Sequence, residues 1–165
     1  MRSIILSVCV VLGLSSLVRA AEKAAPGTPD ALIHGVYKAG DNVFYPAANK
    51  KLSAKFLTPG LIKLLTQDEK LAGNEPYAGF IDCSVLYDSQ DLPKITNFAT
   101  KSEIKGDSAL VKASFANGGE PVVITFKCAK EAGEWRIADV IYKDGRSVLK
   151  MLKANEKEST HLDHI

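Results

Sequence analysis

The spacing of apolar residues predicts three helices in the first part of the chain. The first begins at Thr28, an N-cap residue type followed by proline, and ends at Gly40. A second helix is expected over residues 46–57, and a third over residues 58–73. The apolar positions of the first helix recur at helical spacing: Leu32, Ile33, Val36 and Tyr37.

From residue 95 onward the period of the apolar pattern changes to two, which is typical of strands with one buried face. Asn117 and Ala132 each precede glycine, as in the tight turns of β-hairpins. These turns separate three alternating segments, 109–115, 122–128 and 135–142. The pattern therefore predicts an antiparallel meander after the helices.

Together these elements predict an α+β fold, with N-terminal helices packed on a curved antiparallel sheet in a cone-like domain over residues 28–155. A short strand is also expected over residues 80–86, and a short helix follows the sheet near residues 148–152. Residues 156–165 are expected to form a polar tail. The cone shape predicts a pocket between the sheet and the first helix.

The N-terminal stretch has the pattern of a signal peptide. Arg2 precedes an uncharged apolar run over residues 4–14, and Val18 and Ala20 fit a small-x-small cleavage site. We expect cleavage after residue 20, a flexible lead-in over residues 21–27, and a periplasmic or secreted protein. The run is shorter than the roughly 20 residues of a membrane span, so no membrane partner is expected after cleavage.

Charge makes nucleic acid an unexpected partner. The chain has 21 Lys and Arg against 19 Asp and Glu, and two of the basic residues, Arg2 and Arg19, belong to the leader. The remaining chain is balanced, with both signs interspersed. A nucleic-acid-binding protein is expected to carry a basic stripe or patch.

Two cysteines, Cys83 and Cys128, remain after the leader is removed. In an oxidising compartment the favoured interpretation is a structural disulfide between them. Two unpaired thiols and a redox-active pair are the alternatives, although the chain has no Cys-x-x-Cys motif.

Three segments resemble a family of bacterial exported proteins of unknown function. They are Pro-Tyr-Ala-Gly-Phe-Ile-Asp-Cys at 76–83, Gln-Asp at 90–91, and Gly-Glu-Trp-Arg-Ile-Ala-Asp-Val at 133–140. The resemblance implies a cystatin-like fold, similar to the nuclear-transport-factor-two superfamily and its ketosteroid-isomerase-like members. Ala138 stands where that family often has a second acidic residue, so the resemblance implies no acidic pair there. The superfamily includes enzymes and binding modules, and the family itself implies no activity.

The sequence offers five candidate residues for the pocket: Tyr37, Tyr77, Asp82, Trp135 and Asp139. Strand alternation places Asp139 on the apolar face with Trp135, unless a bulge moves it to the other face. A carboxylate on that face serves either as a pocket acid or base, or as a partner in a buried salt bridge or helix cap.

Neither a metal nor a cofactor is expected. Asp82, Asp88 and Asp91 lie close together but lack the alternating spacing and closing glutamate of a calcium loop. The chain also lacks a nucleophile elbow, a glycine-rich phosphate loop and a zinc-protease motif.

The leading hypothesis is a non-enzymatic exported module that binds a small molecule or a periplasmic protein in the pocket. One alternative is a ketosteroid-isomerase-like enzyme that uses a pocket Asp as base. The other is an inhibitor or immunity-type factor that binds a protein partner through an exposed loop over residues 87–93.

Overall fold

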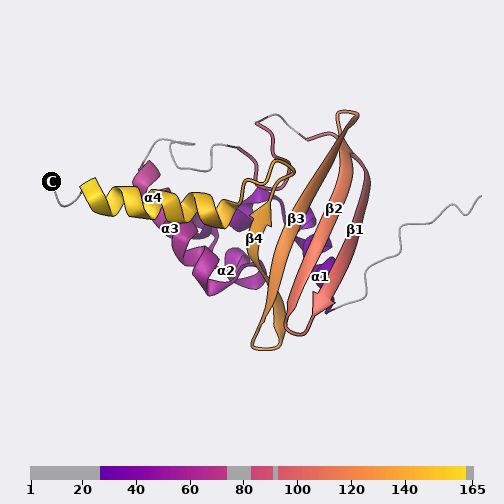
Figure 1. Cartoon of the computed structure of the whole chain (residues 1–165), viewed down its shortest axis with the longest axis horizontal. Helices are drawn as coiled ribbons and strands as arrows, with labels where there is room; N and C mark the ends of the chain where they lie inside the picture. Colours follow the sequence, from indigo (N-terminus) through magenta and orange to yellow (C-terminus); the bar gives the residue numbers. More distant parts are fainter. Residues whose placement is uncertain (1–26, 74–82, 91–92, 163–165) are drawn as a thin grey trace, which may run out of the picture.

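The computed structural model describes residues 27–73, 83–90 and 93–162, and shows an α+β fold (Figure 1). The predicted leader, Tyr77, Asp82 and the last three residues lie outside the described residues. In the described part, the helices are α1 (Pro29–Ala39), α2 (Pro46–Phe56), α3 (Pro59–Ala72) and α4 (Val148–Leu162), with a 3-10 turn, η1 (Asp41–Phe44), after α1.

The predicted helix starts at Thr28 and Thr58 are confirmed. The Thr28 hydroxyl oxygen accepts a hydrogen bond from the backbone N–H of Ala31 at 3.2 Å. The Thr58 hydroxyl does the same for Leu61 at 3.4 Å. Each satisfies one of the N–H groups that a helix leaves unpaired at its N-terminus, and proline follows at the first helical position in both cases.

Four antiparallel strands form an open sheet in the order β1-β2-β3-β4. The strands are β1 (Ile95–Lys105), β2 (Ser108–Asn117), β3 (Glu120–Glu131) and β4 (Glu134–Ile141). Two-residue turns join β2 to β3 and β3 to β4, and positive φ angles at both central positions of each identify type I′ hairpins. The meander predicted from the period of two is therefore confirmed.

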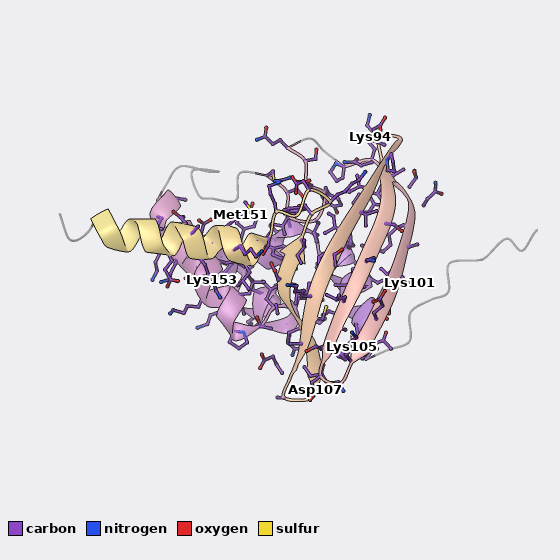
Figure 2. The ribbon with its side chains drawn as sticks, viewed as in Figure 1. Lys94, Lys101, Lys105, Asp107, Met151 and Lys153 are labelled. Carbon is purple, nitrogen blue, oxygen red and sulfur yellow. The ribbon has the colours of Figure 1, made fainter. Side chains whose placement is uncertain are left out.

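Helix α1 crosses one face of the sheet, whereas none of the described helices covers the other face of β1, β2 and β3 (Figure 1). Helices α2, α3 and α4 gather beyond β4. The chain between α2 and α3 lies along the outer edge of β4, where the N–H of Thr58 donates to the carbonyl of Ile137 at 2.9 Å. At the opposite edge, β1 carries Lys101 and Lys105 (Figure 2), charged residues of the kind that discourage pairing with another strand.

The core lies between α1 and the sheet. Ile33 and Val36 of α1 are fully buried against alternate residues of the strands. Tyr37, which is partly buried, packs against this core, with its ring centroid 4.5 Å from that of Phe98 and 5.7 Å from that of Phe115. Burial of large aromatic side chains is a major source of core stability, so this cluster holds α1 on the sheet.

One predicted strand is not formed in the part that can be described. Residues 83–86 of the predicted strand 80–86 lead into a tight turn closed by a bridge between Ser84 and Ser89. The turn inserts Val85 and Leu86 into the core, with 1% and 0% exposure. Asp41 accepts hydrogen bonds from the Ser84 hydroxyl at 2.6 Å and the Leu86 N–H at 3.1 Å, so a side chain satisfies this backbone in place of a neighbouring strand.

The C-terminal helix is longer than expected. Helix α4 runs from Val148 to Leu162 and so continues through most of the segment that the sequence suggests as a polar tail. Its apolar residues near the start, Val148 and Leu152, are buried against the core. Packing of this first part provides the tertiary support that a polar helix sequence lacks by itself.

Candidate ligand-binding pocket

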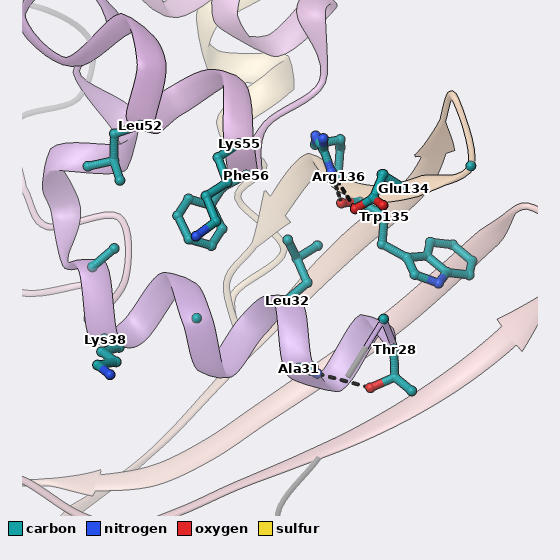
Figure 3. Close-up of a pocket in the computed structure, with 14 residues that line it drawn as sticks. Thr28, Ala31, Leu32, Lys38, Leu52, Lys55, Phe56, Glu134, Trp135 and Arg136 are labelled. Atoms are coloured by element: carbon teal, nitrogen blue, oxygen red, sulfur yellow. Dashed lines mark hydrogen bonds and ion pairs between the residues drawn. The ribbon is translucent and has the colours of Figure 1, made fainter. Parts of the chain in front are cut away.

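An open pocket of about 610 Å³ lies between α1, α2 and the start of β4 (Figure 3). It is on the side of α1 that faces away from the sheet, and its volume lies in the range of small-molecule sites. Lys38 and Leu52 lie toward one end in Figure 3, whereas Thr28 and Trp135 lie toward the other. The lining residues are Gly27, Thr28, Ala31, Leu32, Gly35, Lys38, Ala39, Leu52, Lys55, Phe56, Gly133, Glu134, Trp135 and Arg136.

Helix α1 supplies one wall because it has two apolar sides. Ile33 and Val36 point to the sheet, while Leu32, Gly35 and Ala39 line the pocket. A Cβ atom added at Gly35 would lie 3.0 Å from the Cε1 atom of Phe56. A residue without a side chain at this position therefore lets α1 and α2 approach closely at the floor of the pocket.

The opposite wall is held by the hairpin between β3 and β4. Its turn has φ angles of 51° at Ala132 and 86° at Gly133, which brings Trp135 and Arg136 to the pocket at the beginning of β4. Trp135 is only 8% exposed, and the Lys130 ammonium group lies 5.2 Å from the centre of its ring. A cation at this distance is attracted by the face of the indole.

Arg136 links this wall to α2. Its Nε donates to the carbonyl oxygen of Ala54 at 3.2 Å, and its Nη1 donates to the carbonyl oxygen of Trp135 at 2.9 Å. Glu134 lies 3.7 Å from Nη1. Because these bonds use Nε and Nη1, the guanidinium is fixed in orientation at the edge of the pocket.

Three of the five candidates, Tyr37, Trp135 and Asp139, belong to the described residues, and of these Trp135 alone lines the pocket. Tyr37 belongs to the aromatic core and donates a hydrogen bond from its hydroxyl to the carbonyl of Leu86 at 2.9 Å. Burial raises the pKa of Tyr37 above its usual value, and the neighbouring Tyr87 and Asp41 raise it further. Tyr37 thus anchors the turn at residues 84–89.

Asp139 is not on the core face that strand alternation predicts. The pairing of β3 with β4 matches Cys128 with Ile137 and Lys127 with Asp139, which leaves Ala138 as the extra residue of a bulge. After the bulge, Val140 takes the core-facing position opposite Phe126. Asp139 therefore points to the other face of the sheet, which is the exception that the sequence analysis made for a bulge.

The buried carboxylate of Asp139 holds the N-terminus of α4. The Ser147 hydroxyl donates to it, at 2.9 Å from each oxygen, and the Leu149 N–H donates to Oδ1 at 3.0 Å. Lys127 lies 3.9 Å from Oδ2. Of the two roles that the sequence left open, the structure assigns to Asp139 the helix cap, supplemented by an ion pair.

The expected disulfide between Cys83 and Cys128 is not present in the structure. Cys128 pairs with Ile137 in the sheet, whereas Cys83 lies near Tyr142 and contributes to raising its pKa. The charge of Asp30, in the first turn of α1, contributes to raising the pKa of Cys128, so the two cysteines have different neighbours.

Several residues in this site were not predicted from the sequence. Lys38, Lys55 and Arg136 line the pocket, together with Leu52 and Phe56. The apolar residues on the side of α1 away from the sheet could have indicated the pocket, because a helix that is covered on one face only carries polar residues on its other side. The contribution of α2 depends on long-range packing and has no comparable indication in the sequence.

In the part of the chain that can be described, no group of three or more His, Cys, Asp and Glu residues is arranged to hold a metal ion. None of the described helices combines the length and apolar character needed to cross a membrane.

No protein-family model matches the chain, and comparison with curated proteins gives no match. Among solved structures, the chain is similar to a phospholipid-binding protein from Ralstonia solanacearum, determined in complex with a phospholipid. The two chains are 17% identical, and the similarity covers 78% of this chain and 74% of the other with a TM-score of 0.33. A TM-score this low carries no argument about function, which must come from the residues of the pocket.

Proposed function

We propose that this chain is an exported, non-enzymatic module that binds a small molecule in the pocket between α1, α2 and β4. The observation that carries the proposal is the pocket itself, about 610 Å³ in volume with an apolar floor that includes Leu32 and Phe56. Apolar side chains around an open pocket favour a ligand that covers them. Export rests on the leader-like N-terminus, and membership of the cystatin-like exported family rests on the resemblance of the three segments.

The chemistry of the lining residues favours binding over catalysis. Thr28 already caps α1, and Glu134, close to Arg136, is the one carboxylate in the described lining of the pocket. Asp139, one of the two candidate bases of the enzyme hypothesis, accepts hydrogen bonds at the start of α4 and does not line the pocket; the other, Asp82, lies outside the described residues. An isomerase of this type needs its base within reach of the substrate, so Asp139 is not placed for that role.

Native mass spectrometry of the full chain, expressed with its own leader in a bacterial host, tests the proposal. We expect a polypeptide mass that begins at Ala21 and an added mass from a non-covalently bound small molecule. The variant Ala31→Phe places a ring in the pocket and should abolish the added mass. Ala48→Phe, at an exposed position of α2 away from the pocket, is the matched control and should keep it.

Two results would contradict the proposal. If the folded protein carries no added mass and binds no member of a panel of small amphiphiles, the pocket has no ligand-binding role. If Ala31→Phe retains the bound molecule while remaining folded by circular dichroism, the molecule binds elsewhere.

A further inference from the structure

Three cationic side chains from three separate elements surround the pocket. Lys38 comes from the last turn of α1, Lys55 from the last turn of α2, and Arg136 from β4. Among the described residues that line the pocket, Glu134 supplies the single negative charge, and its carboxylate lies 3.7 Å from Nη1 of Arg136. The pocket therefore has an excess of positive charge.

The two lysines are available to a ligand. Within the described ranges, neither Lys38 nor Lys55 has a carboxylate within ion-pair distance; Lys55 lies 5.3 Å from the ring centre of Phe56. Like charges around one concave surface repel each other, and walls of low dielectric strengthen their field inside the pocket. A bound anion would relieve this repulsion.

The walls between these charges are apolar. Leu32, Leu52 and Phe56 face the pocket near the lysines, and Ala31 and Ala39 extend the same surface along α1. Figure 3 shows Leu32 and Phe56 between the end that carries Lys38 and the end that carries Trp135. A small hydrophilic anion would leave this surface uncovered, whereas an apolar chain attached to the anion would bury it.

We infer that the ligand of this pocket is a single-chain amphiphile with an anionic headgroup, whose charge lies near Lys38 and Lys55 and whose apolar chain covers Leu32, Phe56 and Trp135. The inference rests on the proposed binding function and specifies its ligand class. A carboxylate and a phosphate headgroup share the required chemistry, and the experiment separates them.

Trp135 is the single tryptophan of the chain, so its fluorescence reports on the pocket directly. The probes are four twelve-carbon amphiphiles below their micelle concentrations: laurate, dodecyl phosphate, dodecanol and dodecyltrimethylammonium. We expect at least one anionic probe to bind ten-fold or more tightly than dodecanol at low salt, and the cationic probe to bind more weakly still. The advantage of the anion should shrink as salt rises, because partly exposed charges are screened. Which of the two anions binds more tightly identifies the headgroup.

The double variant Lys38→Gln/Lys55→Gln should reduce the preference for the anion to less than three-fold and leave dodecanol binding unchanged. The control Lys101→Gln/Lys112→Gln removes two exposed lysines that lie opposite each other on β1 and β2 and do not line the pocket. It should keep the full preference. Isothermal titration calorimetry provides the same constants without relying on Trp135.

Equal binding of laurate, dodecyl phosphate and dodecanol would overturn the inference but leave the proposed binding function standing. Loss of preference in the Lys101/Lys112 control would also overturn it, since net charge alone would then explain the effect. A third outcome is that native mass spectrometry shows a different bound molecule and none of the four probes binds. This result would reject the ligand class but support the proposed binding function of the pocket. Failure of both experiments would reject both proposals.

Discussion

Replacement of Asp139 by alanine is expected to destabilise the protein strongly, because this carboxylate joins β4 to the N-terminus of α4. The side chain is 4% exposed and accepts hydrogen bonds from Ser147 and from the N–H of Leu149. Removing the acceptor leaves two donors unsatisfied in a buried position, each at a cost of roughly 1–3 kcal/mol. Lys127 adds little, since its side chain is 52% exposed.

The expected loss is therefore roughly 2–6 kcal/mol of unfolding free energy, a large part of the 5–15 kcal/mol typical of a domain of this size. Asp139→Asn keeps one oxygen acceptor and should lose about half as much. Urea denaturation followed by circular dichroism measures the loss. Glu103→Ala removes an exposed carboxylate from β1 and should change the free energy by about 0.5 kcal/mol or less.

A loss below about 1 kcal/mol for Asp139→Ala would refute this reasoning, because the two donors would then have found other partners at no cost. The folded fraction of the variant should also bind the pocket ligand with unchanged affinity. A weaker affinity of the folded variant than of the folded wild-type protein would show that Asp139 contributes to ligand binding.

Three further outcomes follow from buried groups. Burial raises the pKa of both Tyr37 and Tyr142 above that of an unfolded tyrosine, so the folded state retains more protons at high pH. The unfolding free energy should therefore fall above about pH 10, by up to about 1.4 kcal/mol per pH unit for each tyrosine, and Tyr37→Phe/Tyr142→Phe should reduce this slope in urea titrations to the part that Cys128 and Tyr87 contribute. Burial raises the pKa of Cys128 to about 12, so alkylation of the native protein at pH 8, read by peptide mass spectrometry, should modify Cys128 only after denaturation. Thr58→Ala removes the cap of α3 and should lower the urea midpoint by an amount equivalent to about 1 kcal/mol.

The elements that could be predicted from the sequence are those whose determinants are local. Thr28 and Thr58 start helices through contacts three residues away, and strand alternation gives the faces of β2 and β3. The turn at residues 84–89 could not be predicted, because Asp41, which satisfies its backbone, lies 43 residues before Ser84.

The pocket is only partly visible in the sequence for the same reason. Trp135 is one of the candidates named from the sequence, and it does line the pocket. Lys55 and Phe56 reach the pocket only because α2 packs beside α1, where Gly35 permits close approach. Sequence periodicity describes which side of α1 is apolar, but it does not tell which element covers each side.

The bulge in β4 offers a direct test of how side-chain faces are set in this sheet. Because Ala138 is the extra residue between the pairs Cys128–Ile137 and Lys127–Asp139, its deletion would leave both pairs intact and restore regular alternation. Deletion of Val140, two residues later, would instead move Ile141, the last residue of β4, to the core-facing position opposite Phe126. We expect the Ala138 deletion to fold and bind ligand with a loss of about 1–2 kcal/mol, and the Val140 deletion not to fold. Urea denaturation followed by circular dichroism measures the unfolding free energy of each deletion variant.

If both deletions abolish folding, the curvature that the bulge gives to β4 is itself required to bring Ile137 beside the chain that enters α3. The face on which Asp139 lies would then be set by the curvature of β4 as well as by its pairing register with β3.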